Sequence, residues 1–240
     1  LQNHVALTAR DLETLQHSLH DADAEAAAFR AVAAPLLARS PWQSTFEWLP
    51  RVTRAQRDAF ETAPSALDGM SIRELDASGA VVRAGSRDEY FPVAWTDPAA
   101  GREALVGLDH AHDAQRGSAL ARALASRAMT STPPLSSIAD SPEGRLVQTL
   151  YAPVADEAAA AGFPSDPAPV RGVVAATLDL AGLLEASLAQ MGTHDQTLLL
   201  FDPDAPASAA LLWSDGKPLQ IIAPETRQGL AARIAGGVST

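Results

Sequence analysis

The chain contains no cysteine, and this absence excludes several chemistries at once. Without thiols there are no disulfides, no thiolate metal sites and no cysteine nucleophile. A cysteine-free composition also fits an oxidising compartment. Catalytic signatures are missing too, since there is no G-x-S-x-G elbow, no phosphate-binding loop and no H-E-x-x-H zinc motif. We therefore expect no catalytic residues and no cofactor in this segment.

Long apolar runs and positive charge are also scarce. No apolar run reaches the roughly 18 residues that cross a bilayer, and the N-terminus does not have the pattern of a signal peptide. The chain starts with Leu1 inside a helical pattern, so we expect a piece of a longer protein whose membrane helices lie outside it. The net charge of −11 argues against nucleic acid and against an anionic membrane surface as partners.

The composition of the 240 residues, with 47% hydrophobic and 20% charged, is typical of a folded globular protein. Apolar residues recur at alternating spacings of three and four from Leu1 to Ala33, which predicts one long helix over residues 1 to about 34. Pro35 and the pair Ser40-Pro41 are expected to end it. Such a helix is about 50 Å long. It either packs on its own domain or forms a stalk that pairs with a second protomer.

Short strand signals follow, separated by turns and short helices. Strands are expected at residues 46–49, 70–75, 80–82, 90–95, 145–151, 173–180, 198–201 and 211–213. Helices are expected at residues 54–62, 114–129 after the N-cap Asp113, 181–190 and 224–235. Because turns and irregular loops join several of these strands, the pattern predicts an α+β fold with antiparallel sheets rather than regular βαβ units.

Residues 90–95 and 107–110 combine an aromatic strand signal with a single carboxylate, Asp109. Asp109 is either a solvated turn residue or an acceptor for ligand N–H groups, where a charge-assisted hydrogen bond is strong. The aromatic residues Phe91, Trp95 and Tyr151 fit a plain core as well as a pocket wall, because pocket walls are largely apolar. We expect no metal at His110 and His112, since neither has a helical i, i+4 partner.

Several short segments in order resemble the CHASE domain, an extracellular sensor module of membrane receptors with histidine kinase or cyclic-nucleotide output domains. The matching residues are Arg51-Val52, Arg57, Phe60-Glu61, Arg87 to Val93, Gly107-Leu108-Asp109, Arg116 to Arg122, Ala128 to Ser131, Tyr151 to Val154 and Arg171 to Val174.

The resemblance implies a stalk helix over residues 1–40, a membrane-distal PAS-like ligand-binding subdomain over 41–182 and a membrane-proximal PAS-like subdomain over 183–240. It implies a periplasmic location in an inner-membrane receptor, most simply a sensor histidine kinase or a diguanylate cyclase. The implied ligand is cytokinin-like, an adenine derivative with an apolar tail. The implied ligand-binding residues are Asp109, Phe91, Trp95, Leu108, Met129, Leu135 and Tyr151.

Two functions of different classes remain open from the sequence. The first is a small-molecule sensor that acts as a homodimer through its N-terminal helix. The second is a PAS-like interaction or dimerisation module without a small-molecule ligand. The carboxylate of Asp109 is the residue on which the first function depends.

Overall fold

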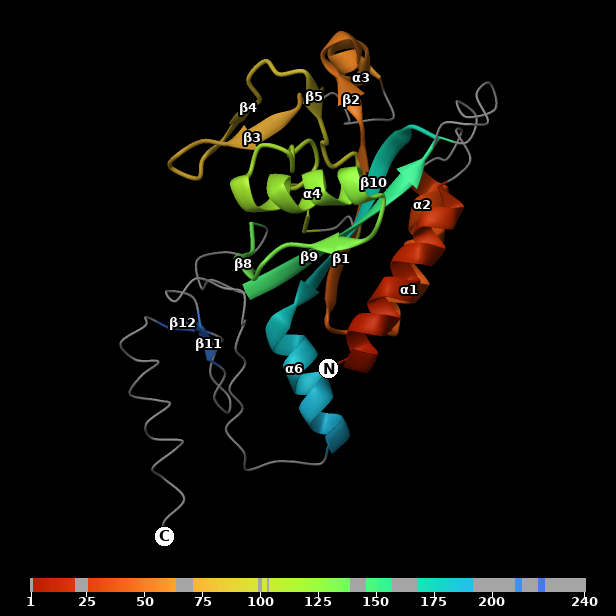
Figure 1. Ribbon diagram of the computed structural model, residues 1–240, viewed down its shortest axis with the longest axis vertical. Helices are drawn as coiled ribbons and strands as arrows, with labels where there is room; N and C mark the ends of the chain where they lie inside the picture. The colour runs from red at the N-terminus through yellow and green to blue at the C-terminus, as the bar shows by residue number, and fades with distance from the viewer. Residues whose placement is uncertain are drawn as a thin grey trace.

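A six-stranded antiparallel sheet forms the centre of the structure (Figure 1). The computed structural model describes residues 2–19, 26–63, 71–98, 101–102, 104–138, 146–156, 168–191, 210–212 and 220–222. The strand order is β6-β1-β10-β9-β7, and β8 also pairs with β9. The strands span Gln43–Pro50 (β1), Trp95–Asp97 (β6), Thr130–Ser131 (β7), Leu135–Ser136 (β8), Leu146–Ala155 (β9) and Val170–Asp179 (β10). The predicted α+β class with antiparallel pairing is confirmed.

Both faces of this sheet are covered, and the two-residue period of its strands assigns each side chain to a face. On β10, Val174 and Ala176 point into a cluster with the N-terminal helices, whereas Val173 and Ala175 point into a cluster with α4. On β9, Tyr151 faces α4 and both of its neighbours face the N-terminal helices. The two long strands are therefore apolar along most of their length.

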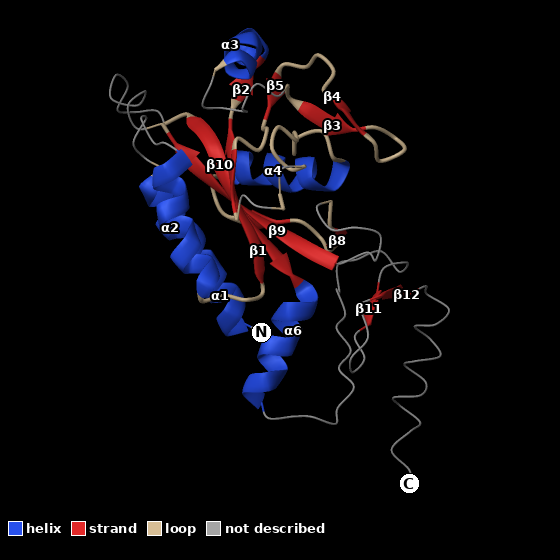
Figure 2. Cartoon of the chain, turned by 180° about the vertical axis from the view of Figure 1, so that it is seen from behind, coloured by secondary structure: helices blue, strands red, loops and turns tan. Residues whose placement is uncertain are grey.

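Two helices, α1 (Gln2–Ser18) and α2 (Ala26–Ala38), cover one face of the sheet (Figures 1 and 2). The prediction of one continuous helix is wrong, because the helical segment is folded in two and α1 packs beside α2. An ion pair between Arg39 and the buried Asp11 joins them. Folding back lets Leu15 on α1 and Phe29 on α2 both bury themselves against the sheet. Pro35 lies inside α2, at an exposed position, and does not end it.

The other face carries α4 (Ala114–Ser126) and a layer of short elements above it. These are β2 (Val52–Thr53), η1 (Arg54–Gln56), α3 (Arg57–Thr62), β3 (Arg73–Leu75), β4 (Val81–Arg83) and β5 (Glu89–Tyr90). The strands predicted at residues 70–75 and 80–82 contain β3 and β4, which pair as a hairpin, and Gly79 adopts a φ of 82° in its turn. Asp113 caps α4 as predicted, accepting hydrogen bonds from the backbone N–H groups of Gln115 and Arg116.

The strand predicted for residues 90–95 is divided in the structure. Tyr90 ends β5, which pairs with β2, and Trp95 begins β6, which pairs with β1. Between them, Pro92 forms an isolated bridge with Asp109. Proline has no N–H to donate to a ladder, which favours a break at this position. The segment instead pairs with the chain around Asp109, which brings the two halves of the predicted site together.

The C-terminal part begins with α6 (Leu180–Met191), which follows β10 directly, as predicted. A small hairpin of β11 (Ala210–Leu212) and β12 (Gln220–Ile222) is described beyond it. The predicted strand 198–201 and helix 224–235 lie outside the described residues, and the division into subdomains at residues 40 and 182 stays a prediction. None of the described helices is both long and apolar enough to cross a membrane.

Candidate ligand-binding site

Two neighbouring hollows lie on the α4 side of the sheet: an outer one between the β3–β4 hairpin and the loop that leads into α4, and an inner one over the central strands. The outer hollow has a volume of about 530 Å³ and is lined by Leu75, Asp76, Ala77, Gly79, Leu108, Asp109, His110, His112, Asp113, Ala114, Arg116 and Ile138. The inner recess has a volume of about 30 Å³ and is lined by Ser44, Thr45, Glu47, Arg102, Leu105, His110, Arg116, Ser137, Ile138, Val147, Thr149 and Thr177. They share His110, Arg116 and Ile138. The outer volume is that of a small-molecule pocket.

The wall of the inner recess comes from the three central strands. Thr45 and Glu47 on β1, Thr149 on β9 and Thr177 on β10 occupy positions whose side chains face α4. The hydroxyl oxygens of Thr149 and Thr177 lie 3.3 Å apart. Further along the same strands, the residues on this face are apolar. The sheet therefore changes from an apolar core to a polar wall where the recess lies.

Glu47 is the buried acid of the recess, with a relative exposure of 2%. Its Oε1 accepts a hydrogen bond of 3.0 Å from the Thr45 hydroxyl. Its Oε2 has no hydrogen bond from the described residues and lies 3.6 Å from His110 Nε2. Burial raises the pKa of Glu47, although the Thr45 hydrogen bond and the charges of Arg116 and Arg102 act in the opposite direction.

His110 stands between the two hollows and is held by Tyr151. The His110 Nδ1 and the Tyr151 hydroxyl are 2.9 Å apart, and the two rings meet edge to face. Burial, together with the charge of Arg116, lowers the pKa of His110 to about 3, so its imidazole is neutral at pH 7. Burial also raises the pKa of Tyr151. Arg116 Nη1 lies 3.6 Å from a carboxylate oxygen of Asp113.

Asp109 lies in the wall of the outer hollow with a relative exposure of 2%. Its Oδ1 accepts backbone hydrogen bonds from Phe91 at 2.8 Å and Ala111 at 3.1 Å. Its Oδ2 accepts a hydrogen bond of 2.8 Å from Arg87 Nη1. The carboxylate thus fixes the loop on which it sits. A carboxylate has about four acceptor sites, so one on Oδ2 remains for a ligand donor.

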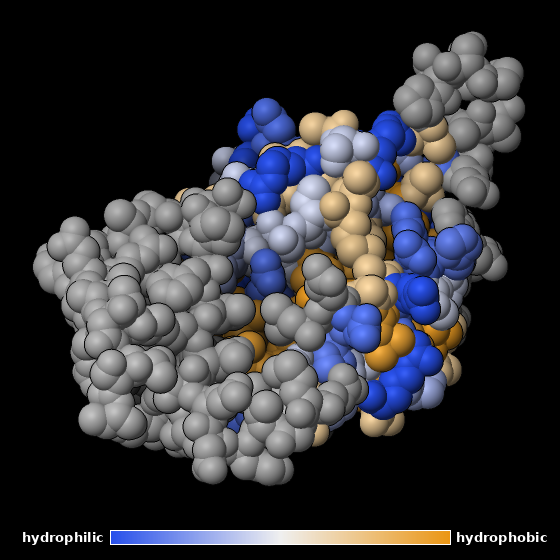
Figure 3. Space-filling model, turned by 60° about the horizontal axis from the view of Figure 1, so that its bottom comes forward, coloured by the Kyte–Doolittle hydropathy of each residue, from blue (hydrophilic) through white to orange (hydrophobic). Residues whose placement is uncertain are grey.

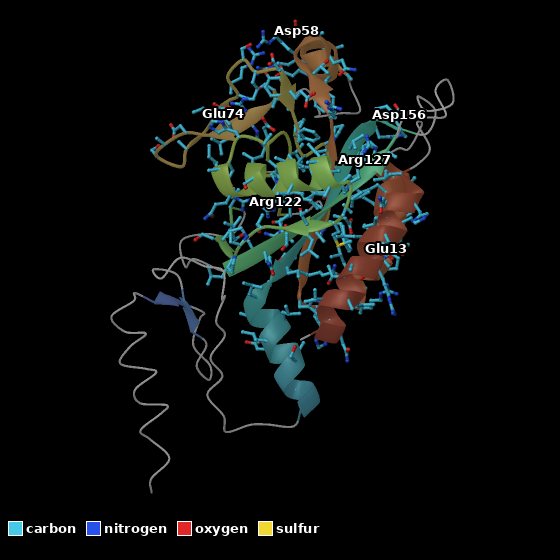
Figure 4. All side chains as sticks on the ribbon, viewed as in Figure 1. Glu13, Asp58, Glu74, Arg122, Arg127 and Asp156 are labelled. Carbon is cyan, nitrogen blue, oxygen red and sulfur yellow. The ribbon has the colours of Figure 1, made fainter. Side chains whose placement is uncertain are left out.

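Arg87 connects this loop to the hairpin layer. Besides Asp109, its guanidinium pairs with Glu74, which is labelled in Figure 4 on the hairpin side of α4. Burial lowers the pKa of Arg87, but the hydrogen bonds to Glu74 and Asp109 outweigh it and raise that pKa overall. Burial raises the pKa of Glu74, but the pairing with Arg87 prevails and lowers it overall. Arg87 Nη2 also lies 3.0 Å from His112 Nδ1.

The structure places the other predicted ligand-binding residues at different depths. Leu108 lines the outer hollow, and Phe91 and Tyr151 lie in the apolar cluster beneath α4. Leu135 is buried on β8 opposite Val147 of β9. Trp95 and Met129 pack against the cluster of the N-terminal helices. The structure therefore brings Asp109, Leu108, Phe91 and Tyr151 to one side of the sheet and does not bring Trp95 and Met129 there.

Glu47, His110 and Arg116 belong to the site but were not identified from the sequence as its residues. One signal was available for Glu47. It stands between Phe46 and Trp48 in a strand segment, and a charged residue inside an apolar segment faces either solvent or a polar cavity. Only the position of α4 decides between those two surroundings. Among the described residues, no group of three His, Asp or Glu side chains is arranged to hold a metal ion.

Comparison with known proteins assigns this architecture. The CHASE domain profile matches residues 22–213. The chain belongs to the CHASE domain family. CHASE domains are extracellular sensor modules of membrane proteins, and this chain is a sensor domain of that class.

Two solved structures are similar to this CHASE domain at low sequence identity. A protein described as methyl-accepting chemotaxis protein X has a TM-score of 0.46 and 14% identity, over 98% of this chain and 77% of its own. The ligand-binding domain of the Pseudomonas aeruginosa PAO1 amino acid chemoreceptor PctC, in complex with GABA, has a TM-score of 0.44 and 17% identity, over 88% of this chain and 68% of its own. No curated protein gives a significant match.

Proposed function

We propose that this CHASE domain detects a small molecule that binds in the outer hollow beside Asp109. The observation that supports the proposal most is the hollow of about 530 Å³ between the β3–β4 hairpin and the loop that leads into α4. Its wall combines apolar surface from Leu75 and Leu108 with carboxylates. Such a wall accepts a ligand that has both an apolar part and hydrogen-bond donors.

The proposed ligand class is a planar molecule with N–H donors, and a cytokinin-like adenine derivative is the leading candidate. Asp76, Asp109 and Asp113 all line the outer hollow. Carboxylates accept N–H hydrogen bonds strongly and disfavour a ligand that presents an anion to them. Residues 87–93 and 107–109 resemble the CHASE domain, and cytokinin, the ligand of the plant members of that family, belongs to the same class.

A thermal-shift screen with adenine derivatives tests this proposal. We expect N6-isopentenyladenine or a close relative to raise the melting temperature. Asp109→Asn removes the charge but retains an acceptor, so it should weaken the binding of the best compound about tenfold, as one charge-assisted hydrogen bond warrants. Asp88→Asn is the control, because Asp88 is exposed and does not line the hollow. If no adenine derivative shifts the melting temperature, this ligand class is wrong.

The proposed signalling role depends on the contact between α1 and α6. His4 near the start of α1 lies 3.1 Å from the Ser187 hydroxyl of α6, and its ring packs against Trp42. A ligand that binds two arrangements of these helices with different affinity shifts the population between them. We propose a periplasmic domain that acts as a homodimer through its N-terminal helices and controls a cytoplasmic histidine kinase or diguanylate cyclase.

A further inference from the structure

The unpaired oxygen of Glu47 is a second polar feature of the site, separate from Asp109. Glu47 Oε2 is buried, lines the inner recess and receives no hydrogen bond from the described residues. A buried acceptor without a donor destabilises the folded state, and such groups are rare in native proteins. In a sensor domain, a ligand that supplies the missing donor gains affinity from this arrangement.

We propose that the inner recess receives one neutral N–H donor of the ligand, accepted by Glu47 Oε2, while the rest of the ligand occupies the outer hollow. This inference rests on the proposed function, because it assumes a ligand in the outer hollow. It assigns the ligand an N–H group that projects past His110, Arg116 and Ile138, the residues that both hollows share. Glu47 is then a ligand-binding residue of the domain.

The charges of the recess determine which donor it accepts. Arg102 and Arg116 line the same space as Glu47, so an ammonium group would meet two guanidinium groups there. An anionic group would meet the carboxylate of Glu47 itself. A neutral amine, amide or ring N–H avoids both repulsions and still donates a hydrogen bond to the carboxylate.

The size of the recess limits the group further. Its volume of about 30 Å³ is small beside the 530 Å³ of the outer hollow, so it admits only a small group. The ring of His110 does not fill this role, since its Nε2 lies 3.6 Å from Glu47 Oε2. The neutral state of the imidazole also rules out an ion pair at pH 7.

A matched pair of probes tests the donor directly. N6-isopentenyladenine carries an exocyclic N–H, and 6-(isopentenyloxy)purine carries an oxygen in its place with nearly the same shape. On the wild-type domain, calorimetry should show about tenfold tighter binding of the amine, the value of one hydrogen bond to a charged group. Glu47→Gln should abolish this preference, and Asp109→Asn should retain it. The reverse pattern places the donor at Asp109 and overturns the proposal.

Ligand-free stability decides the matter if neither probe binds. Because its surroundings disfavour the ionised form, Glu47→Gln should raise the melting temperature by about 2–4 °C. Glu61→Gln is the control. Its carboxylate accepts hydrogen bonds from Arg57, Arg83 and the Ile72 N–H, so its melting temperature should fall. If neither probe binds but Glu47→Gln raises the melting temperature, the adenine class is rejected. The conclusion that Glu47 Oε2 lacks a hydrogen-bond donor is then supported. A destabilised Glu47→Gln makes Glu47 a structural residue and rejects the inference.

Discussion

Two buried carboxylates in the candidate site differ in how fully they are paired. Asp109 receives three hydrogen bonds from Phe91, Ala111 and Arg87, whereas Glu47 receives one, from Thr45. Asp109 uses three of its acceptor sites to hold its loop in place, and one site remains. Glu47 retains an acceptor that a ligand can use. Loss of Asp109 is therefore expected to affect structure and binding together, and loss of Glu47 mainly binding.

His110 makes the stability of the domain depend on pH. Its folded-state pKa is about 3, against 6.5 for a free histidine. Between these values the unfolded chain binds a proton that the folded chain does not, so stability falls as the pH drops from about 6.5 towards 3. His110→Asn removes this contribution. Between pH 7 and pH 5, the variant should lose about 2 kcal/mol less unfolding free energy than its parent, as urea denaturation measures it.

The parent protein for that comparison should carry Glu47→Gln. The pKa of Glu47 is raised, so protonating Glu47 at low pH stabilises the folded state and partly masks the effect of His110. Arg116 and Tyr151 also face His110, but both keep the same charge over this pH range. If the Glu47→Gln parent and its His110→Asn variant lost equal unfolding free energy between pH 7 and pH 5, His110 would be protonated at pH 5 in the folded state as well.

The sequence identified Asp109 but not its partners, for a physical reason. The motif around Asp109 is local, and its separation from the aromatic segment is short. Arg87 pairs with both Asp109 and Glu74, and Glu74 comes near only because the hairpin folds over α4, an arrangement that no local pattern encodes. Glu47 is similar. Alternation places it on the face opposite Phe46 and Trp48, but whether that face meets water or a cavity depends on elements far along the chain.

At the scale of elements, the N-terminal helices belong to the core of the domain. Leu12 and Leu15 on α1, and Leu19 directly after it, are fully buried in one cluster with the sheet. The spacing of three and four correctly predicted helical structure and the burial of Leu15 and Phe29. It wrongly put Val5, which is 38% exposed, on the apolar side, and it could not predict that the segment folds in two. Either a straight helix in a stalk or two helices packed side by side can bury the same apolar stripe. Only the sheet beneath them favours the pair of helices.

Two substitutions on α1 separate its core face from its outer face. Leu15→Ala should lower the unfolding free energy by about 2–5 kcal/mol, because it leaves a cavity under the hairpin. Val5 is 38% exposed, so Val5→Arg should change stability by less than about 0.5 kcal/mol. Urea denaturation measures both.

The same Val5→Arg protein tests the proposed dimer. In sedimentation velocity it should dissociate at a higher concentration than the wild type, because a charge is placed on the outer face of the helix. An unchanged dimer would exclude this part of α1 from the interface. In the stability test, an unchanged unfolding free energy for Leu15→Ala would contradict the packing of α1 on the sheet.

At the scale of the whole molecule, the two faces of the sheet differ in what they contain. The face toward α1 and α2 is closed by apolar packing, and the face toward α4 contains the hollows. Seen from the end where α1 begins and α6 ends, hydrophilic and hydrophobic residues adjoin one another on the described surface (Figure 3). The α+β class was predictable because the strand and turn signals are local. The depth of the site was not, since it arises from layers that meet only in the folded chain.

A crystal structure of the domain with the adenine derivative that stabilises it most tests the ligand site most directly. We expect ligand density in the outer hollow between Leu108, Asp109 and Arg116, with an N–H group within hydrogen-bond distance of Glu47 Oε2. Density elsewhere on the domain, or an outer hollow filled by the protein's own side chains, would contradict it.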